Sequence, residues 1–120
     1  CYRQGGMVAR TPYVPERGDV VLVNFSPQQE HEQASTRPAV VLSPKFYNAK
    51  SRLALMCPIT SQVKGYPFEI LLDMDKVNGV ILSDQVRSLD WKARRIRFIA
   101  RLKPDILHAV RERVIQLIMD

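Results

Sequence analysis

The chain has 120 residues, 46% of them hydrophobic, and a net charge of +6. This length and hydrophobic content suit one globular domain, and the chain is too short for two. No apolar run reaches the ~20 residues of a membrane helix, and the first residues lack a signal-peptide pattern, so we expect a cytoplasmic protein without membrane contact. We interpret residues 1–6 as a cloning or upstream remnant and 7–120 as the single domain, because Met7 follows a Gly-containing opening.

Short apolar runs between turn residues predict the first strands at 20–23, 38–43 and 53–57, the last of them ended by Pro58. Residues 26–36 form a polar connection that is longer than usual and is therefore a candidate functional loop. Residues 45–51 are expected to form a turn or one helical turn. Cys57 lies in an apolar run and is expected to pack as a small hydrophobic side chain.

Further strands are predicted at 68–72, 80–82, 86–89 and 97–102, with a polar turn at 61–66 and an Asn-Gly turn signal within 73–79. Closely spaced short strands of this kind indicate a compact barrel or sandwich. After Pro104 the apolar residues recur at three- to four-residue spacing, which predicts a core-facing C-terminal helix. Its expected buried stripe is Ile106, Val110, Val114, Leu117 and Ile118.

Residues 87–103 contain seven Lys and Arg side chains, opposed within that interval only by Asp90. Trp91 lies inside this cluster and Phe98 close to it. Basic side chains with interleaved aromatic rings suit phosphate attraction together with base stacking, so the cluster predicts a polyanion-binding surface. The same surface would attract an acidic protein tail.

Five ordered blocks resemble the MazF/PemK toxin family, which includes the Kid-like members. They are HEQ (31–33), TRPAVVLSP (36–44), CPITSQ (57–62), KGYPFE (64–69) and DQVRS (84–88). The resemblance implies a small SH3-like barrel with a C-terminal helix, mainly β, that forms a homodimer. It also implies a sequence-specific, metal-independent endoribonuclease that cleaves single-stranded mRNA, uses no cofactor and is inhibited by a cognate antitoxin with an acidic disordered tail. Such a toxin reaches DNA only indirectly, through the antitoxin.

RNA can be cut without a metal because its own 2′-OH can attack the adjacent phosphate. No Cys/His spacing in the chain suits a metal site, and none is expected. Arg37 begins a strand beside the polar loop, and its planar fork matches two phosphate oxygens, so we expect it to stabilise charge. The resemblance implies that Arg37 is catalytic, and it adds Thr60, whose hydroxyl can donate to a phosphate oxygen.

Three residues compete for the role of general base. Glu32 matches the carboxylate of the family loop, and His31 matches the histidine of the Kid-like members. Asp84 aligns with an aspartate of that branch, although Leu82 replaces the arginine that accompanies it there. We favour Glu32, since it can fold back to pair with Arg37 and stay ionised.

The remaining candidate residues are contacts to RNA rather than acid–base groups. The resemblance implies this role for Gln33, Lys64, Tyr66, Gln85 and Arg87. Two non-enzymatic alternatives stay open, because a fold does not determine a function. One is a protein-binding toxin like CcdB, and the other is an SH3-like module that binds nucleic acid.

Overall fold

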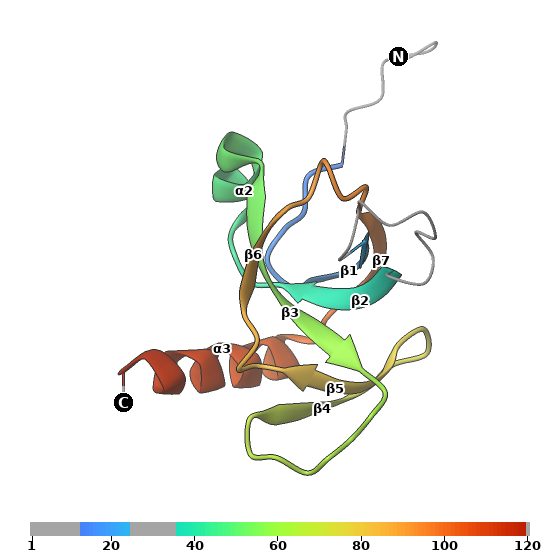
Figure 1. Ribbon diagram of the computed structural model, residues 1–120, viewed down its shortest axis with the longest axis vertical. Coiled ribbons are helices and arrows are strands. Elements are labelled where there is room, and N and C mark those ends of the chain that lie inside the picture. The colour runs from blue at the N-terminus through green and yellow to red at the C-terminus, as the bar shows by residue number, and fades with distance from the viewer. Residues whose placement is uncertain (1–12, 25–35, 120) are drawn as a thin grey trace.

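The computed structural model describes residues 13–24 and 36–119. Residues 1–6 and the greater part of the predicted 26–36 loop lie outside these described residues. A small, mainly β fold with a C-terminal helix is observed, as predicted (Figure 1). Its elements are β1 (Asp19–Asn24), β2 (Thr36–Val41), α2 (Lys45–Ser51), β3 (Leu53–Thr60), β4 (Glu69–Asp73), β5 (Asn78–Leu82), β6 (Arg87–Asp90), β7 (Arg97–Arg101) and α3 (Pro104–Met119).

The strands form one antiparallel sheet that curls into a half-barrel (Figure 1). Its order is β4-β5-β3-β2-β1-β7, and β6 pairs with β3 beside this path. The long strand β3 connects the two parts of the sheet. Residues 53–56 of β3 pair with β6, whereas Ile59 and Thr60 pair with β5.

Strand pairing explains two differences from the sequence-based prediction. Strand β3 continues through Pro58 to Thr60. Pro58 pairs with Ala39 of β2 on one edge, and on the other edge it lies between the segments that pair with β6 and β5, a break in the ladder that tolerates its missing N–H. Asn78 and Gly79 lie within β5 rather than in a turn. The preceding turn is closed by the Met74 N–H, which donates to the Val77 carbonyl at 3.0 Å.

Two hydrophobic cores fill the two faces of the curled sheet. The first joins sheet residues such as Val40 and Ile81 to Val110 of α3. The second lies on the other face and contains Met56 and Trp91. The Trp91 ring is 8% exposed, and its indole N–H donates to the Asn48 carbonyl at 2.9 Å. The expectation that Trp91 stacks on nucleic-acid bases is therefore wrong, because the chain after β6 turns this ring into the core.

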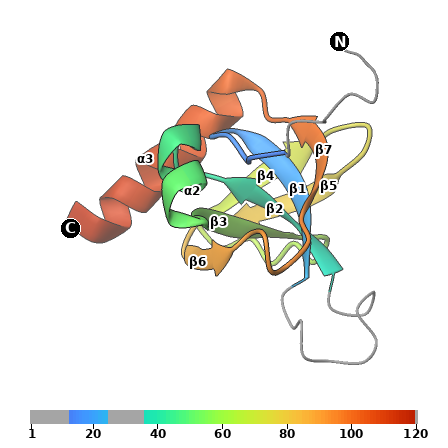
Figure 2. The same cartoon turned by 90° about the horizontal axis from the view of Figure 1, so that it is seen from above.

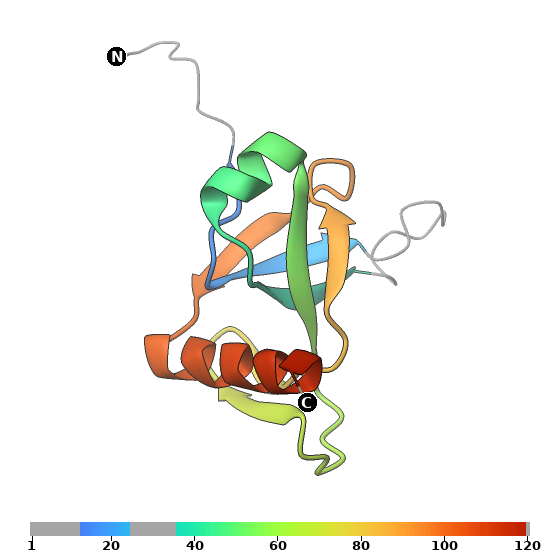
Figure 3. The same cartoon turned by 90° about the vertical axis from the view of Figure 1, so that its left-hand side faces the viewer.

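Helices α2 and α3 lie on the same side of the molecule, with α2 near one end and β4 extending beyond α3 at the other (Figures 2 and 3). The first turns of α3 cover the first core, through residues such as Ile106 and Val114. In its last turn Leu117 is 56% exposed and Ile118 75% exposed, contrary to the predicted buried stripe. Within the part of the chain that the structure describes, no helix is long and apolar enough to cross a membrane.

Candidate active site

The pairing of β2 with β3 brings the two predicted catalytic side chains together. Ala39 lies opposite Pro58 and Val41 opposite Met56. Arg37 and Thr60 each lie two residues beyond the Ala39–Pro58 pair, and alternate residues of a strand project from the same face, so both side chains lie on the face of that pair. Toward Val41 and Met56 that face is buried in the second core. Arg37 and Thr60 therefore lie at the edge of this core, where the face is accessible to solvent.

Gly79 allows β5 to approach the end of β3 that carries Thr60. A Cβ atom at position 79 would lie 2.2 Å from the Thr60 carbonyl oxygen, and the residue has a φ of +141°. Both the close approach and the backbone angle therefore require glycine. Position 79 thus helps to place the Thr60 end of the strand.

Arg37 and Thr60 line a polar cavity of about 250 Å³. Three predicted RNA contacts line it with them, so motifs from four parts of the sequence converge on one site. Arg37, Lys64, Tyr66 and Gln85 are exposed there, and Thr60 is half-buried. The full lining consists of Arg37, Thr60, Gln62, Lys64, Tyr66, Phe68, Glu69, Leu82 and Gln85.

The connection between β3 and β4, residues 61–68, forms one wall of this cavity. The rings of Tyr66 and Phe68 stack with their centroids 5.2 Å apart. The Glu69 carboxylate accepts hydrogen bonds from the backbone N–H of Lys64 at 3.2 Å and of Gly65 at 2.9 Å. Sequence reasoning assigned no role to Glu69, although it is the last residue of the KGYPFE block and lies four residues after Gly65.

Other predicted residues lie elsewhere or outside the described residues. Arg87 is on β6, opposite Met56, and does not line the cavity. His31, Glu32 and Gln33 are outside the described residues. The choice among the candidate bases therefore stays a prediction.

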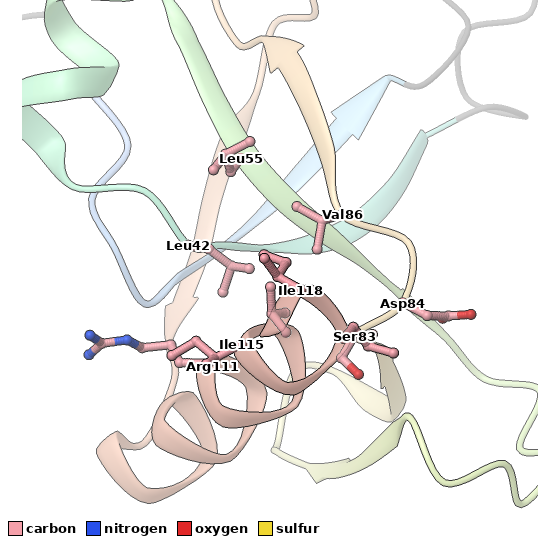
Figure 4. Close-up of a pocket in the computed structure, with 10 residues that line it drawn as sticks. Leu42, Leu55, Ser83, Asp84, Val86, Arg111, Ile115 and Ile118 are labelled. Carbon is pink, nitrogen blue, oxygen red and sulfur yellow. The ribbon is translucent and has the colours of Figure 1, made fainter. Parts of the chain in front are cut away.

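Asp84 lines a different cavity, between the sheet and the last turns of α3. This apolar groove of about 380 Å³ is lined by Leu42, Leu55, Ser83, Asp84, Val86, Arg111, Val114, Ile115, Leu117 and Ile118. Its aliphatic side chains face one another, whereas the Asp84 carboxylate points away from them (Figure 4).

Burial, and then the nearby Asp84 charge, raise the pKa of Cys57 to about 12. The buried Cys57 thiol therefore stays protonated at neutral pH, consistent with its predicted packing role.

Part of the predicted basic cluster has a structural role. Arg101 donates to the carboxylates of Asp19 at 2.6 Å and Glu16 at 2.9 Å, and so ties β7 to β1 and the segment before it. The Arg94 guanidinium donates to the Asn24 carbonyl at 3.0 Å. Among residues 13–24 and 36–119, no three His, Cys, Asp or Glu side chains gather in a way that could hold a metal ion.

A family model described as "PemK-like, MazF-like toxin of type II toxin-antitoxin system" matches residues 16–118. The chain belongs to this toxin family. Endoribonuclease toxin MazF of Escherichia coli K12 is 45% identical over 112 residues, which cover 93% of this chain and 99% of that protein.

Solved structures of the PemK/MazF family have the same fold. MazF of Deinococcus radiodurans is 46% identical, with a TM-score of 0.81, and the match covers 91% of this chain and all of that one. A MazE-MazF structure from the same organism has a TM-score of 0.81 and 42% identity, covering 90% of this chain and 98% of that chain. The family resemblance inferred from the five sequence blocks is therefore confirmed.

Proposed function

We propose that this protein is the endoribonuclease toxin of a type II toxin–antitoxin module and cleaves single-stranded mRNA in the cytoplasm at specific sequences. The observation that carries the proposal is the meeting of Arg37 and Thr60 in a polar cavity with Lys64 and Gln85. The 45% identity to an endoribonuclease toxin over nearly the whole chain supports it. A cation, a hydroxyl and amide groups in one open cavity suit a phosphodiester and its neighbouring bases.

Cleavage proceeds by attack of the RNA 2′-oxygen on the adjacent phosphorus. The base, for which we propose Glu32 with His31 and Asp84 as alternatives, takes the 2′-OH proton as the new O–P bond forms. Arg37 and the Thr60 hydroxyl stabilise the extra negative charge on the phosphate oxygens. The bond from phosphorus to the 5′-oxygen then breaks, and that oxygen takes up a proton from water. The products are a 2′,3′-cyclic phosphate and a 5′-hydroxyl, and no step requires a metal ion.

Incubation of the purified protein with single-stranded RNA in EDTA tests this mechanism. We expect cleavage that continues in the chelator and leaves 5′-hydroxyl ends, which a kinase can label without prior phosphatase treatment. A 5′-phosphate product, or activity abolished by EDTA, would contradict the mechanism. Binding of RNA without cleavage would instead favour the nucleic-acid-binding module, and neither binding nor cleavage would favour a CcdB-like toxin.

The exposed end of α3 supports the homodimer that we propose as the active form. Ile115, Leu117 and Ile118 are 48%, 56% and 75% exposed and border the apolar groove. A contiguous apolar surface of this kind is typical of a protein interface. We further propose that RNA and the acidic antitoxin tail compete for the same basic surface, and that DNA is reached only through the antitoxin.

A further inference from the structure

Glu69 closes the β3–β4 connection through reciprocal hydrogen bonds. Its carboxylate accepts the N–H groups of Lys64 and Gly65, and its own backbone N–H donates to the Tyr66 carbonyl at 3.1 Å. One residue therefore holds three consecutive positions of the wall that faces Arg37. Two of these positions, Lys64 and Tyr66, are the side chains proposed to contact RNA.

The two ends of this wall are held by different groups. At the end that leads into β4, the Phe68 carbonyl accepts hydrogen bonds from the Ser83 N–H at 3.3 Å and from the Ser83 hydroxyl. The Pro67 carbonyl accepts a hydrogen bond from the Arg113 guanidinium. The corner at Gly65 has no comparable packing, because nothing lies within 4 Å of the place where its Cβ would stand. At this corner the Glu69 carboxylate accepts the hydrogen bonds of the Lys64 and Gly65 N–H groups.

A carboxylate in a cavity for RNA should weaken binding, because it repels phosphate. Glu69 is the acidic side chain among the residues that line the cavity, beside Arg37 and Lys64. Its two oxygens already accept backbone N–H groups, at 3.2 and 2.9 Å for Oε1 and 3.3 Å for Oε2. These hydrogen bonds direct both carboxylate oxygens toward the backbone of the Lys64–Gly65 corner.

We propose that Glu69 is a positioning residue for RNA recognition. Its carboxylate holds the Lys64–Gly65 corner so that Lys64 and Tyr66 project into the cavity. The inference rests on the proposed function, since it concerns how the same site accepts RNA. The gain from a fixed wall then exceeds the repulsion between one carboxylate and the RNA phosphates, so removing Glu69 weakens binding instead of strengthening it.

Cleavage kinetics of Glu69→Ala and Glu69→Gln on one single-stranded RNA test the proposal. For Glu69→Ala we expect KM to rise about tenfold, as a loss of roughly 1.4 kcal/mol in binding would produce, with kcat nearly unchanged. Glu69→Gln keeps an acceptor oxygen and should recover most of the loss. Glu112→Ala removes a carboxylate from an exposed position of α3 and should behave like the wild type.

Amide hydrogen exchange at Lys64 and Gly65 gives a second measurement that does not depend on activity. We expect both amides to lose protection in Glu69→Ala, while the melting temperature shows that the variant is folded. A lower KM in Glu69→Ala would show that repulsion dominates and would overturn the proposal. The proposal would also be overturned if Glu69→Ala lost kcat and its pH–rate profile lost an ionisation, because Glu69 would then be a base.

The same measurements separate this inference from the proposed function. A wild-type protein that cleaves no RNA refutes the proposed function and, with it, the RNA half of this proposal. An active wild type with unchanged KM and unchanged amide protection in Glu69→Ala refutes only the role of Glu69. An active wild type with lost protection but unchanged KM also overturns it, because the corner would then be irrelevant to RNA.

Discussion

Arg37 is exposed at the second position of β2, so its side chain contributes little to the core. We expect Arg37→Ala to keep its melting temperature but to lose ~10²–10³-fold in kcat, since removing one charge-stabilising donor costs about 2.7–4 kcal/mol of barrier. Single-turnover cleavage would measure this. Arg37→Lys keeps the charge but not the fork and should recover only part of the rate. Near wild-type turnover by folded Arg37→Ala would remove it from the mechanism.

At the scale of single residues, we also predict that Glu32 rather than His31 is the general base. We expect Glu32→Gln to abolish most of the turnover, and His31→Ala mainly to raise KM. In an extended loop, adjacent side chains would point to opposite sides, and His31 would then face away from the proton that Glu32 takes. A base works in its deprotonated form, so kcat should fall as the pH drops through its pKa. Pairing with Arg37 would keep the Glu32 pKa low, which puts that fall in acid.

The pH–rate profiles of the two variants decide between these bases. In His31→Ala the acidic limb of the wild-type profile should remain. The roles would be reversed if His31→Ala removed an ionisation near pH 6–7, about the ordinary imidazole pKa, together with most of the turnover. Glu32→Gln would then have to retain activity.

At the scale of elements, Asn48 in α2 joins parts of the chain that are distant in sequence. Its side-chain amide donates to the carbonyls of Pro15 at 2.8 Å and Ser43 at 3.0 Å, and its Oδ1 accepts the Ser43 hydroxyl. Its backbone carbonyl accepts the Trp91 indole. Asn48 is fully buried, so these bonds replace the ones that water would make.

We therefore expect Asn48→Ala to lower the free energy of unfolding by about 2–3 kcal/mol, because buried partners would lose their donors and acceptor. Urea denaturation would measure the change. Ala49→Ser, at the next and exposed position of α2, should change it by less than about 0.5 kcal/mol. Asn48→Ala should cleave RNA normally while folded, since Asn48 does not line the cavity. An unchanged unfolding midpoint would contradict the role given to Asn48.

At the scale of the whole molecule, the groove beside α3 tests the proposed dimer. We expect Ile118→Glu to shift the protein from dimer to monomer, because a carboxylate in an apolar interface loses its hydration. Sedimentation velocity at micromolar concentration would detect the change. Ala49→Glu puts the same charge on an exposed position of α2 and should stay dimeric. A wild type that sediments as a stable monomer would contradict the proposal.

The family, the β-rich fold and the approximate position of each strand and of the final helix could be predicted from the amino-acid sequence. These are local properties, because the period of apolar residues and the turn residues between them report burial along one segment. The ordered blocks also identified Arg37, Thr60, Lys64, Tyr66 and Gln85, which the structure brings together in one cavity.

The tertiary structure alone decided which residues face one another. The pairing of β2 with β3 puts Arg37 and Thr60 on one face of the sheet, and a change of partner along the other edge of β3 lets the strand pass through Pro58. The same long-range packing buries Trp91 in the core and leaves Ile118 exposed at the open groove beside the sheet. A residue pattern reports how much of a side chain is buried along its own segment. The partner against which it is buried comes from segments far away in the sequence, and that depends on the fold as a whole.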